Sequence, residues 1–90
     1  MELDKDEMSK VSNRLKRAQG QLAAVVRMLD EGRDCEDVVT QLAAVSRALD
    51  RAGFAIIASG MRQCLVEGTE PGRPAELDVH KLEKLFLSLA

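Results

Sequence analysis

The spacing of apolar residues along the chain predicts two long helices. In the first third of the chain, apolar residues recur every three or four positions, which is the spacing of one face of an α-helix. These positions are Val11, Leu15, Ala18, Leu22, Val25 and Leu29. A second row with the same spacing consists of Val38, Leu42, Val45, Leu49, Ala52 and Ile56. We therefore expect helices over about residues 5–31 and 35–67.

Polar and glycine residues mark where these two helices begin and end. Asp4 and Glu7 form a D-x-x-E start that resembles a capping box. Gly32 suits the left-handed residue that commonly follows the end of a helix. Asp34 then suits the N-cap of the second helix, which places Cys35 in its first turn.

A third, shorter helix is expected near the end of the chain. Gly68 is expected to close the second helix, and the following segment TEPGRP (69–74) is predicted to be a loop because it contains two prolines and a glycine. We expect a helix over 75–89, with apolar positions at Leu77, Val79, Leu82, Leu85, Phe86 and Leu89.

Composition supports an all-α fold. The 90 residues are expected to form one domain, 1–90, in which 46% of residues are hydrophobic, with two Phe and no Trp or Tyr. This composition, which is poor in residues that favour β-strands, suits packing of helix on helix. We expect a three-helix protomer with two long antiparallel helices and a short third. Because so short a chain cannot cover the apolar rows of both long helices, it should dimerise into a four-helix bundle with an isologous interface.

Charge and hydropathy indicate a cytoplasmic protein without general affinity for polyanions. The formal net charge is −2, so any nucleic-acid site has to come from local patterning. No apolar run reaches the ~18 residues of a membrane span, and the start MELDKDEM is too acidic for a signal peptide. In the cytoplasm, two cysteines favour redox chemistry, metal binding or simple burial over a resting structural disulfide.

The two cysteines have a spacing that prevents them from meeting within one chain. Cys35 and Cys64 are separated by 29 positions on the second predicted helix. They therefore share one face, and at a rise of about 1.5 Å per residue they lie roughly 43 Å apart. If two such helices pair antiparallel, Cys35 of one subunit lies beside Cys64 of the other. The alternative is that both are small buried apolar residues.

Basic residues form a stripe beside the apolar row of the first helix. Residues 9–29 contain five basic residues and no acid, and two arginines one turn apart occur on the second helix. Such a stripe suits contact with phosphates and limited reading of bases. The candidate DNA-binding residues are Lys10, Arg14, Lys16, Arg17, Gln21, Arg47 and Arg51. The alternative is a solvated basic face balanced by neighbouring acids.

The stretch NRLKRAQGQLAAVVRMLDEGRDCEDVVTQLAAVSRAL (13–49), with the later Cys64, resembles the CsoR/RcnR family of bacterial repressors. This resemblance covers roughly two-thirds of the chain. It implies an all-helical, disc-shaped dimer of dimers that binds operator DNA and releases it when an inducer reaches the cysteine site. It also implies that Arg14, Arg17 and Arg51 contact DNA.

Differences from the metal-sensing members concern the cysteine site. Copper sensors resemble this chain at both cysteines but carry His where Gly60 stands, and commonly Tyr where Asp34 stands. The nickel and cobalt type has His at the position of Cys64 and an N-terminal His that is missing here. The formaldehyde type has Pro where Glu2 stands. The remaining pattern, two cysteines without histidine, resembles the persulfide-sensing, CstR-like branch.

The resulting hypothesis is a repressor whose inducer is reactive sulfur, a persulfide or polysulfide that links Cys35 to Cys64 of the partner subunit through a disulfide or polysulfide. No cofactor or metal is expected. A Cu(I) sensor that uses the same two thiolates is the alternative, because two thiolates can bind Cu(I) linearly. A helical oligomer without a DNA role is a further alternative. An enzyme is not expected, because there is no C-x-x-C and no catalytic base near either thiol.

Overall fold

A computed structural model describes residues 2–67 and 75–90, and for 64–67 and 75–78 it describes the helical backbone only. The chain forms α1 (Lys5–Asp30), α2 (Cys35–Glu67) and α3 (Ala75–Leu89), and no strand occurs in these ranges. The predicted all-α class is therefore confirmed. The first helix ends at Asp30, one residue earlier than expected, because Glu31 is its C-cap. Gly68 and the expected loop over 69–74 lie outside the described residues.

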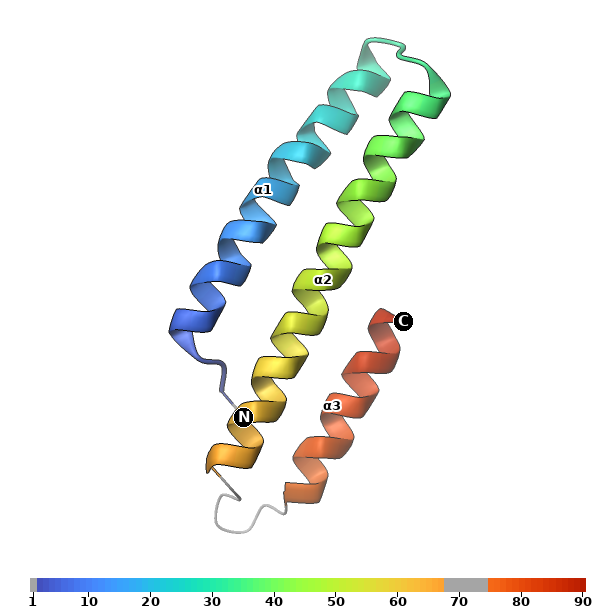
Figure 1. The fold of residues 1–90 in the computed structure, drawn as a ribbon. Coiled ribbons are helices and arrows are strands. Elements are labelled where there is room, and N and C mark those ends of the chain that lie inside the picture. Colours follow the sequence, from blue (N-terminus) through green and yellow to red (C-terminus); the bar gives the residue numbers. More distant parts are fainter. Residues whose placement is uncertain (1, 68–74) are drawn as a thin grey trace.

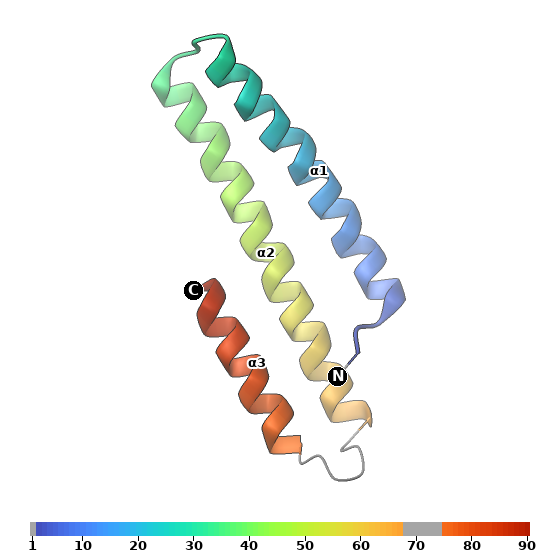
Figure 2. The same ribbon diagram turned by 180° about the vertical axis from the view of Figure 1, so that it is seen from behind.

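The helices form an elongated layer of 57 × 25 × 14 Å. The two long helices run antiparallel as a hairpin, and α3 packs along the C-terminal half of α2, on the side away from α1 (Figure 1). The reverse view shows the same order, with α2 between the other two helices (Figure 2). None of the helices in the described part of the chain combines the length and the apolarity that crossing a bilayer requires.

The turn between α1 and α2 is closed as the sequence predicts. Gly32 has a φ of 70°, the left-handed conformation that glycine adopts without steric cost. The Arg33 amide donates to the Met28 carbonyl and the Gly32 amide to the Leu29 carbonyl, which are the two bonds of a Schellman motif. The Asp34 carboxylate then accepts a hydrogen bond from the Glu36 amide and caps α2. These caps set the antiparallel course of the hairpin.

The start of α1 is only partly as expected. Asp4 is the N-cap, since its Oδ1 accepts hydrogen bonds from the amides of Asp6 and Glu7 at 2.8 and 3.0 Å. The Glu7 side chain does not complete a capping box. It accepts hydrogen bonds from α2 instead. The first turn of α1 is therefore tied to α2 as well as to its own cap.

Most of the buried residues of each long helix recur at every seventh position, and Met28 and Gly60 are buried in addition. The buried rows are Val11, Ala18 and Val25 on α1, and Val38, Val45, Ala52 and Ser59 on α2. The other members of the predicted apolar rows are partly or largely exposed, including Leu22, Leu29, Leu42 and Leu49 at 45–62%. A single hairpin thus leaves a second apolar row uncovered.

The short helix α3 packs on α2 through two close contacts. A Cβ built at Gly53 would lie 2.7 Å from Leu89 Cδ1, so the glycine allows α3 to approach the α2 backbone. One residue further on, the rings of Phe54 and Phe86 stand 5.2 Å apart at 43°. Together these contacts position α3 beside the second half of α2.

Candidate nucleic-acid interface and sensor thiols

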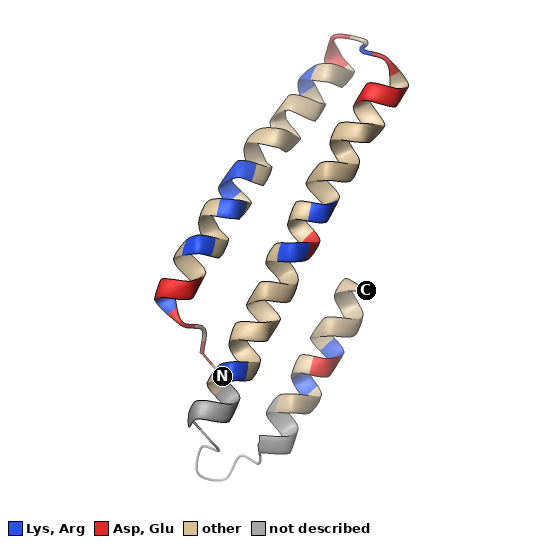
Figure 3. Ribbon diagram, viewed as in Figure 1, with Lys and Arg blue, Asp and Glu red and all other residues tan. Residues whose placement is uncertain are grey.

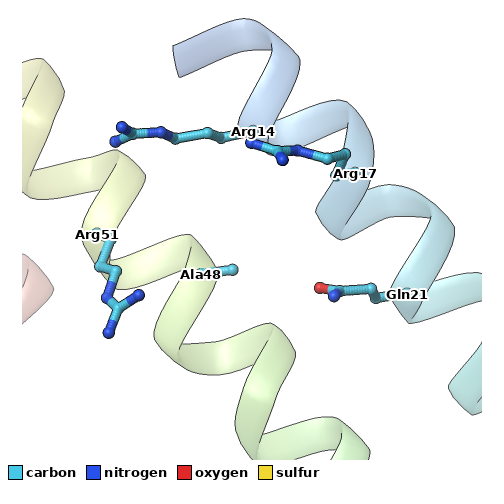
Figure 4. Close-up of a pocket in the computed structure, with 5 residues that line it drawn as sticks. All are labelled: Arg14, Arg17, Gln21, Ala48 and Arg51. Atoms are coloured by element: carbon cyan, nitrogen blue, oxygen red, sulfur yellow. The ribbon is translucent and has the colours of Figure 1, made fainter. Parts of the chain in front are cut away.

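Four of the seven predicted DNA-binding residues lie around one groove between the two long helices. Arg14, Arg17 and Gln21 contribute from α1, and Arg51 contributes from α2, around a volume of about 450 Å³. Ala48 completes the lining and faces α1 across the groove (Figure 4). The lining therefore holds three guanidinium groups, one amide and a methyl group, a donor-rich set that suits phosphate oxygens.

Helical spacing explains why these residues gather. Arg14, Arg17 and Gln21 are separated by three and four positions and share one face of α1. Ala48 and Arg51 are three positions apart on α2, and the antiparallel hairpin brings them opposite that face. In Figure 3, Lys and Arg occupy the middle of both helices along this stretch. Acids gather toward the ends of the hairpin, except for Asp50 next to Arg51 in the middle of α2.

The remaining three predicted residues lie outside the groove lining. Lys10 lines a neighbouring hollow that also includes Arg14, so it extends the basic surface toward the start of α1. Lys16 and Arg47 are exposed and line neither this hollow nor the groove. The structure thus separates the seven residues into a gathered set and two outlying ones.

The two cysteines belong to one uninterrupted helix. Cys35 is the exposed first residue of α2, and Cys64 lies near the C-terminal end of this 33-residue helix. Because no break occurs between them, the 29-residue spacing corresponds to roughly 43 Å along the axis, and positions 35 and 64 share a face. Leu42 and Leu49 follow Cys35 at intervals of seven and are 47% exposed.

Gly60 is buried within α2, one turn before Cys64. A glycine in a helix interior costs about 1 kcal/mol relative to alanine. Because the residue is buried, a side chain at this position would have to fit among the atoms that cover it.

A polar cluster that the sequence analysis missed joins the start of α1 to the last third of α2. The Ser59 hydroxyl donates to Glu7 Oε2 at 2.7 Å, and Arg62 Nη2 donates to Glu7 Oε1 at 2.9 Å. Ser59 is 0% exposed, whereas Arg62 is largely exposed. We call Glu7, Ser59 and Arg62 the clamp. The one sequence clue was a serine at a position where the row of Val38, Val45 and Ala52 predicts an apolar residue.

Hydrogen bonding in the clamp changes the acidity of Glu7. The hydrogen bond from Ser59, followed by that from Arg62, lowers the pKa of the Glu7 carboxyl from its ordinary value of 4.5, because both favour the ionised form. The clamp therefore stabilises the fold only while Glu7 is charged. This contribution is present above the pKa of the unfolded chain and is lost as the pH falls through the lower pKa of the folded chain.

Because the clamp stabilises the fold only while Glu7 is charged, the difference in thermal stability between the wild type and Glu7→Gln should depend on pH. We expect the wild type to have the higher midpoint of thermal unfolding at about pH 7, and the two midpoints to converge as the pH falls toward about 3. Glu31→Gln is the matched control, since Glu31 pairs with Arg33 at 3.9 Å without joining two helices. A difference between wild type and Glu7→Gln that stays constant over this range would contradict the expectation.

No group of three or more His, Cys, Asp and Glu side chains that could hold a metal ion occurs among the residues described. His80 on α3 is exposed, with Nδ1 4.0 Å from Glu83 Oε2. Within one chain, the two cysteines are too far apart to share an ion. A metal bound by both would need thiols from two copies of the chain.

The fold and the groove together define an all-helical hairpin protein with a cationic groove between its long helices. A family model described as metal-sensitive transcriptional repressor matches residues 7–88. The chain therefore belongs to this family, and the predicted resemblance to CsoR/RcnR repressors is confirmed. The family consists of transcriptional repressors, which agrees with the expectation that the chain is not an enzyme.

Individual relatives and one solved structure agree with this family. The copper-sensing transcriptional repressor RicR of Mycobacterium tuberculosis is 33% identical over 70% of this chain and 66% of its own length. The copper-sensing transcriptional repressor CsoR of Mycobacterium ulcerans is 38% identical over 68% of this chain and 52% of its own. The matched stretches thus span about half to two-thirds of these relatives. The nickel-responsive transcriptional regulator InrS superposes over 100% of this chain and 98% of its own, with a TM-score of 0.76 and 28% identity.

Proposed function

We propose that the chain is a cytoplasmic, DNA-binding repressor that leaves its operator when reactive sulfur joins Cys35 to Cys64 of the partner subunit. The observation that carries this proposal is the uninterrupted helix α2, with one cysteine near each end and both positions on one face. Family membership supports the repressor part of the proposal. The pair of thiols without an intervening histidine supports the sulfur part.

Two copies of the chain complete the thiol site. When two α2 helices pair antiparallel, the midpoint between the cysteines falls between Leu49 and Asp50, so the two-fold axis passes there. Leu42 and Leu49 supply exposed apolar surface for this pairing. Covering the apolar rows of both hairpins gives a four-helix bundle with two equivalent dithiol sites. Two such dimers form the disc-shaped tetramer that the family resemblance implies.

The inducer chemistry needs no reagent beyond the persulfide itself. The Cys35 thiolate attacks the terminal sulfur of a persulfide RSSH, which transfers one sulfur atom to Cys35 and releases the thiol RSH. The thiolate of the partner subunit's Cys64 then attacks Cys35 Sγ, the inner sulfur of this persulfide, and breaks its bond to the transferred sulfur. A disulfide forms and hydrosulfide leaves, so the transferred sulfur is reduced while the two cysteines are oxidised. A further sulfur transfer before closure gives a trisulfide or longer bridge.

The groove supplies the DNA side of the mechanism. Arg14, Arg17 and Arg51 can each donate in pairs to phosphate oxygens, and Gln21 can donate to a phosphate or a base edge. Because the groove is shared between α1 and α2, its fit to a duplex depends on how the two helices are aligned. A bridge at the ends of α2 shifts the population toward an alignment that fits DNA less well.

Cu(I) sensing is a second candidate, favoured by the similarity to the copper-sensing repressors RicR and CsoR. Two thiolates from paired subunits can coordinate Cu(I) linearly. Copper-sensing members have a histidine where this chain has Gly60. The imidazole of a histidine at this position would lie one turn from Cys64 and could serve as a third ligand. The loss of that ligand argues for weaker copper binding in this chain.

A Gly60→His variant tests the two candidates against each other. We expect the variant to bind Cu(I) more tightly than the wild type, because it gains an S₂N ligand set, although the burial of Gly60 opposes the added side chain. Polysulfide should release operator DNA from the wild type. Competition with a Cu(I) chelator measures affinity, and fluorescence anisotropy of labelled operator measures release.

Mass spectrometry of the same samples identifies the added sulfur or copper. A Gly60→Ala variant controls for the change in helix propensity without adding a ligand. The copper candidate replaces the persulfide candidate if the wild type already binds Cu(I) as tightly as Gly60→His and releases DNA with it, while polysulfide leaves the complex intact.

A further inference from the structure

The clamp is the one place where side-chain hydrogen bonds join α1 to α2 in the parts of the chain that the structure describes. Elsewhere the two helices meet through apolar side chains such as Val25 and Val45. Apolar contacts of this kind tolerate small shifts, whereas hydrogen bonds depend on distance and angle. The clamp therefore defines the alignment of the hairpin more sharply than the rest of the interface.

Ser59 makes this alignment specific. It occupies a core position seven residues after Ala52 and is 0% exposed, so its hydroxyl cannot turn to water. Glu7 Oε2 accepts a hydrogen bond from this hydroxyl at an oxygen–oxygen distance of 2.7 Å. A shift of α1 by one turn would leave this buried hydroxyl without a partner, which costs free energy comparable to a lost hydrogen bond or more. A buried hydroxyl whose partner lies on the other helix therefore disfavours other registers of the two helices.

The clamp also lies between the two functional regions. Ser59 and Arg62 are five and two residues before Cys64 on the same helix. On α1, Glu7 is seven residues before Arg14 and therefore on the same side. The hollow that contains Glu7 and Arg62 also contains Arg14, which belongs to the basic groove as well.

We propose that Glu7 is the positioning residue that transmits a change at Cys64 to the basic groove, through Ser59 and Arg62. This proposal rests on the proposed function and names the route of its regulation. Bridging Cys64 to the partner subunit displaces the last turns of α2, and Ser59 and Arg62 move with them. Because both hydrogen-bond to Glu7, the first turns of α1 follow, and the alignment of the two walls of the groove changes.

The test measures operator affinity before and after polysulfide treatment in the wild type and in Glu7→Gln. The readout is the ratio of the two dissociation constants, since this ratio isolates coupling from affinity. Allosteric coupling is typically worth about 5–150-fold, and we expect the ratio to fall about tenfold in Glu7→Gln. A change in the operator affinity of the reduced variant, which follows if the clamp aligns the groove, cancels from this ratio.

Ser59→Ala provides a second variant, in which a small apolar residue at a buried helical position preserves folding. It should lower the ratio in the same direction but less, because Arg62 still pairs with Glu7. Glu31→Gln, at the far end of the hairpin, should keep the wild-type ratio. Mass spectrometry verifies that all proteins carry the same sulfur modification.

The outcomes separate transmission from a merely structural role. If Glu7→Gln and Ser59→Ala lower thermal stability but keep the wild-type ratio, the clamp only holds the fold and the proposal is wrong. If wild type with a complete sulfur bridge stays on the operator, the proposed function fails and the transmission route fails with it. The proposal is supported if the ratio of the two dissociation constants falls below the wild-type value in Glu7→Gln and Ser59→Ala but not in Glu31→Gln.

Discussion

Replacing Arg14, Arg17 or Arg51 by alanine is expected to weaken operator binding about tenfold or more at moderate salt. The slope of log affinity against log salt concentration should fall by about one, the amount that corresponds to one lost phosphate contact. The reason is that these three guanidinium groups line one groove, where a phosphate oxygen can meet donors from both long helices. The measurement is the dissociation constant by fluorescence anisotropy at several salt concentrations. Size-exclusion chromatography should show an unchanged oligomer, because all three residues are exposed.

Lys16→Ala and Arg47→Ala are matched controls for charge. Both residues are exposed and basic, and neither lines the groove. They remove the same unit of charge from the surface, so a smaller loss of affinity in these variants shows that position matters beyond net charge. If all three groove variants bind operator as the wild type does, the groove is not the DNA-binding surface.

Removal of either cysteine is expected to abolish the response to reactive sulfur. Polysulfide should convert the wild type to an SDS-resistant dimer that reductant separates, and the same treatment should release operator DNA. Cys35→Ser and Cys64→Ser should each lack the covalent dimer and stay on the operator, because each variant lacks one of the two thiols that the intersubunit bridge joins. Non-reducing electrophoresis and anisotropy on the same samples measure both effects.

A mixture of the two cysteine variants tests the pairing directly. Mixed dimers contain one Cys35 from one chain and one Cys64 from the other, so they should regain a single covalent bridge. Each variant alone provides the matched control. Covalent dimers in Cys64→Ser alone would indicate that Cys35 pairs with Cys35 of a second chain, and covalent dimers in Cys35→Ser alone would indicate the same for Cys64. Either result would contradict the proposed site.

The helices themselves could be predicted closely because their ends are set by local interactions. Asp4, Gly32 and Asp34 each act within a few residues of their own position, through a side-chain cap or a left-handed turn. The gathering of Arg14, Arg17 and Gln21 followed from helical periodicity in the same way. Arg51 joins them through the hairpin, which the positions of the caps also define.

Burial and the clamp could not be predicted because they depend on how the two helices are rotated against each other. Periodicity identified one apolar row on each helix. The structure divides this row into buried members such as Val45 and exposed members such as Leu49. The expected capping box failed for a similar reason: Glu7 reaches a buried serine on another helix, and local spacing contains no information about that partner.

The continuity of α2 makes the length of this helix a functional constraint. One residue inserted between Cys35 and Cys64 would turn the second position by about 100° and move the thiols onto different faces. Insertions of seven or eleven residues would return both thiols to one face, but they would lengthen the distance between the thiols by about 10 or 16 Å. The midpoint between the cysteines, and with it the two-fold axis, would then move away from Leu49 and change its distance from Arg51. Insertions and deletions therefore damage sensing and DNA binding together. New inducer specificity in this scaffold has to arise by substitution, as at Gly60, with the length of the helix preserved.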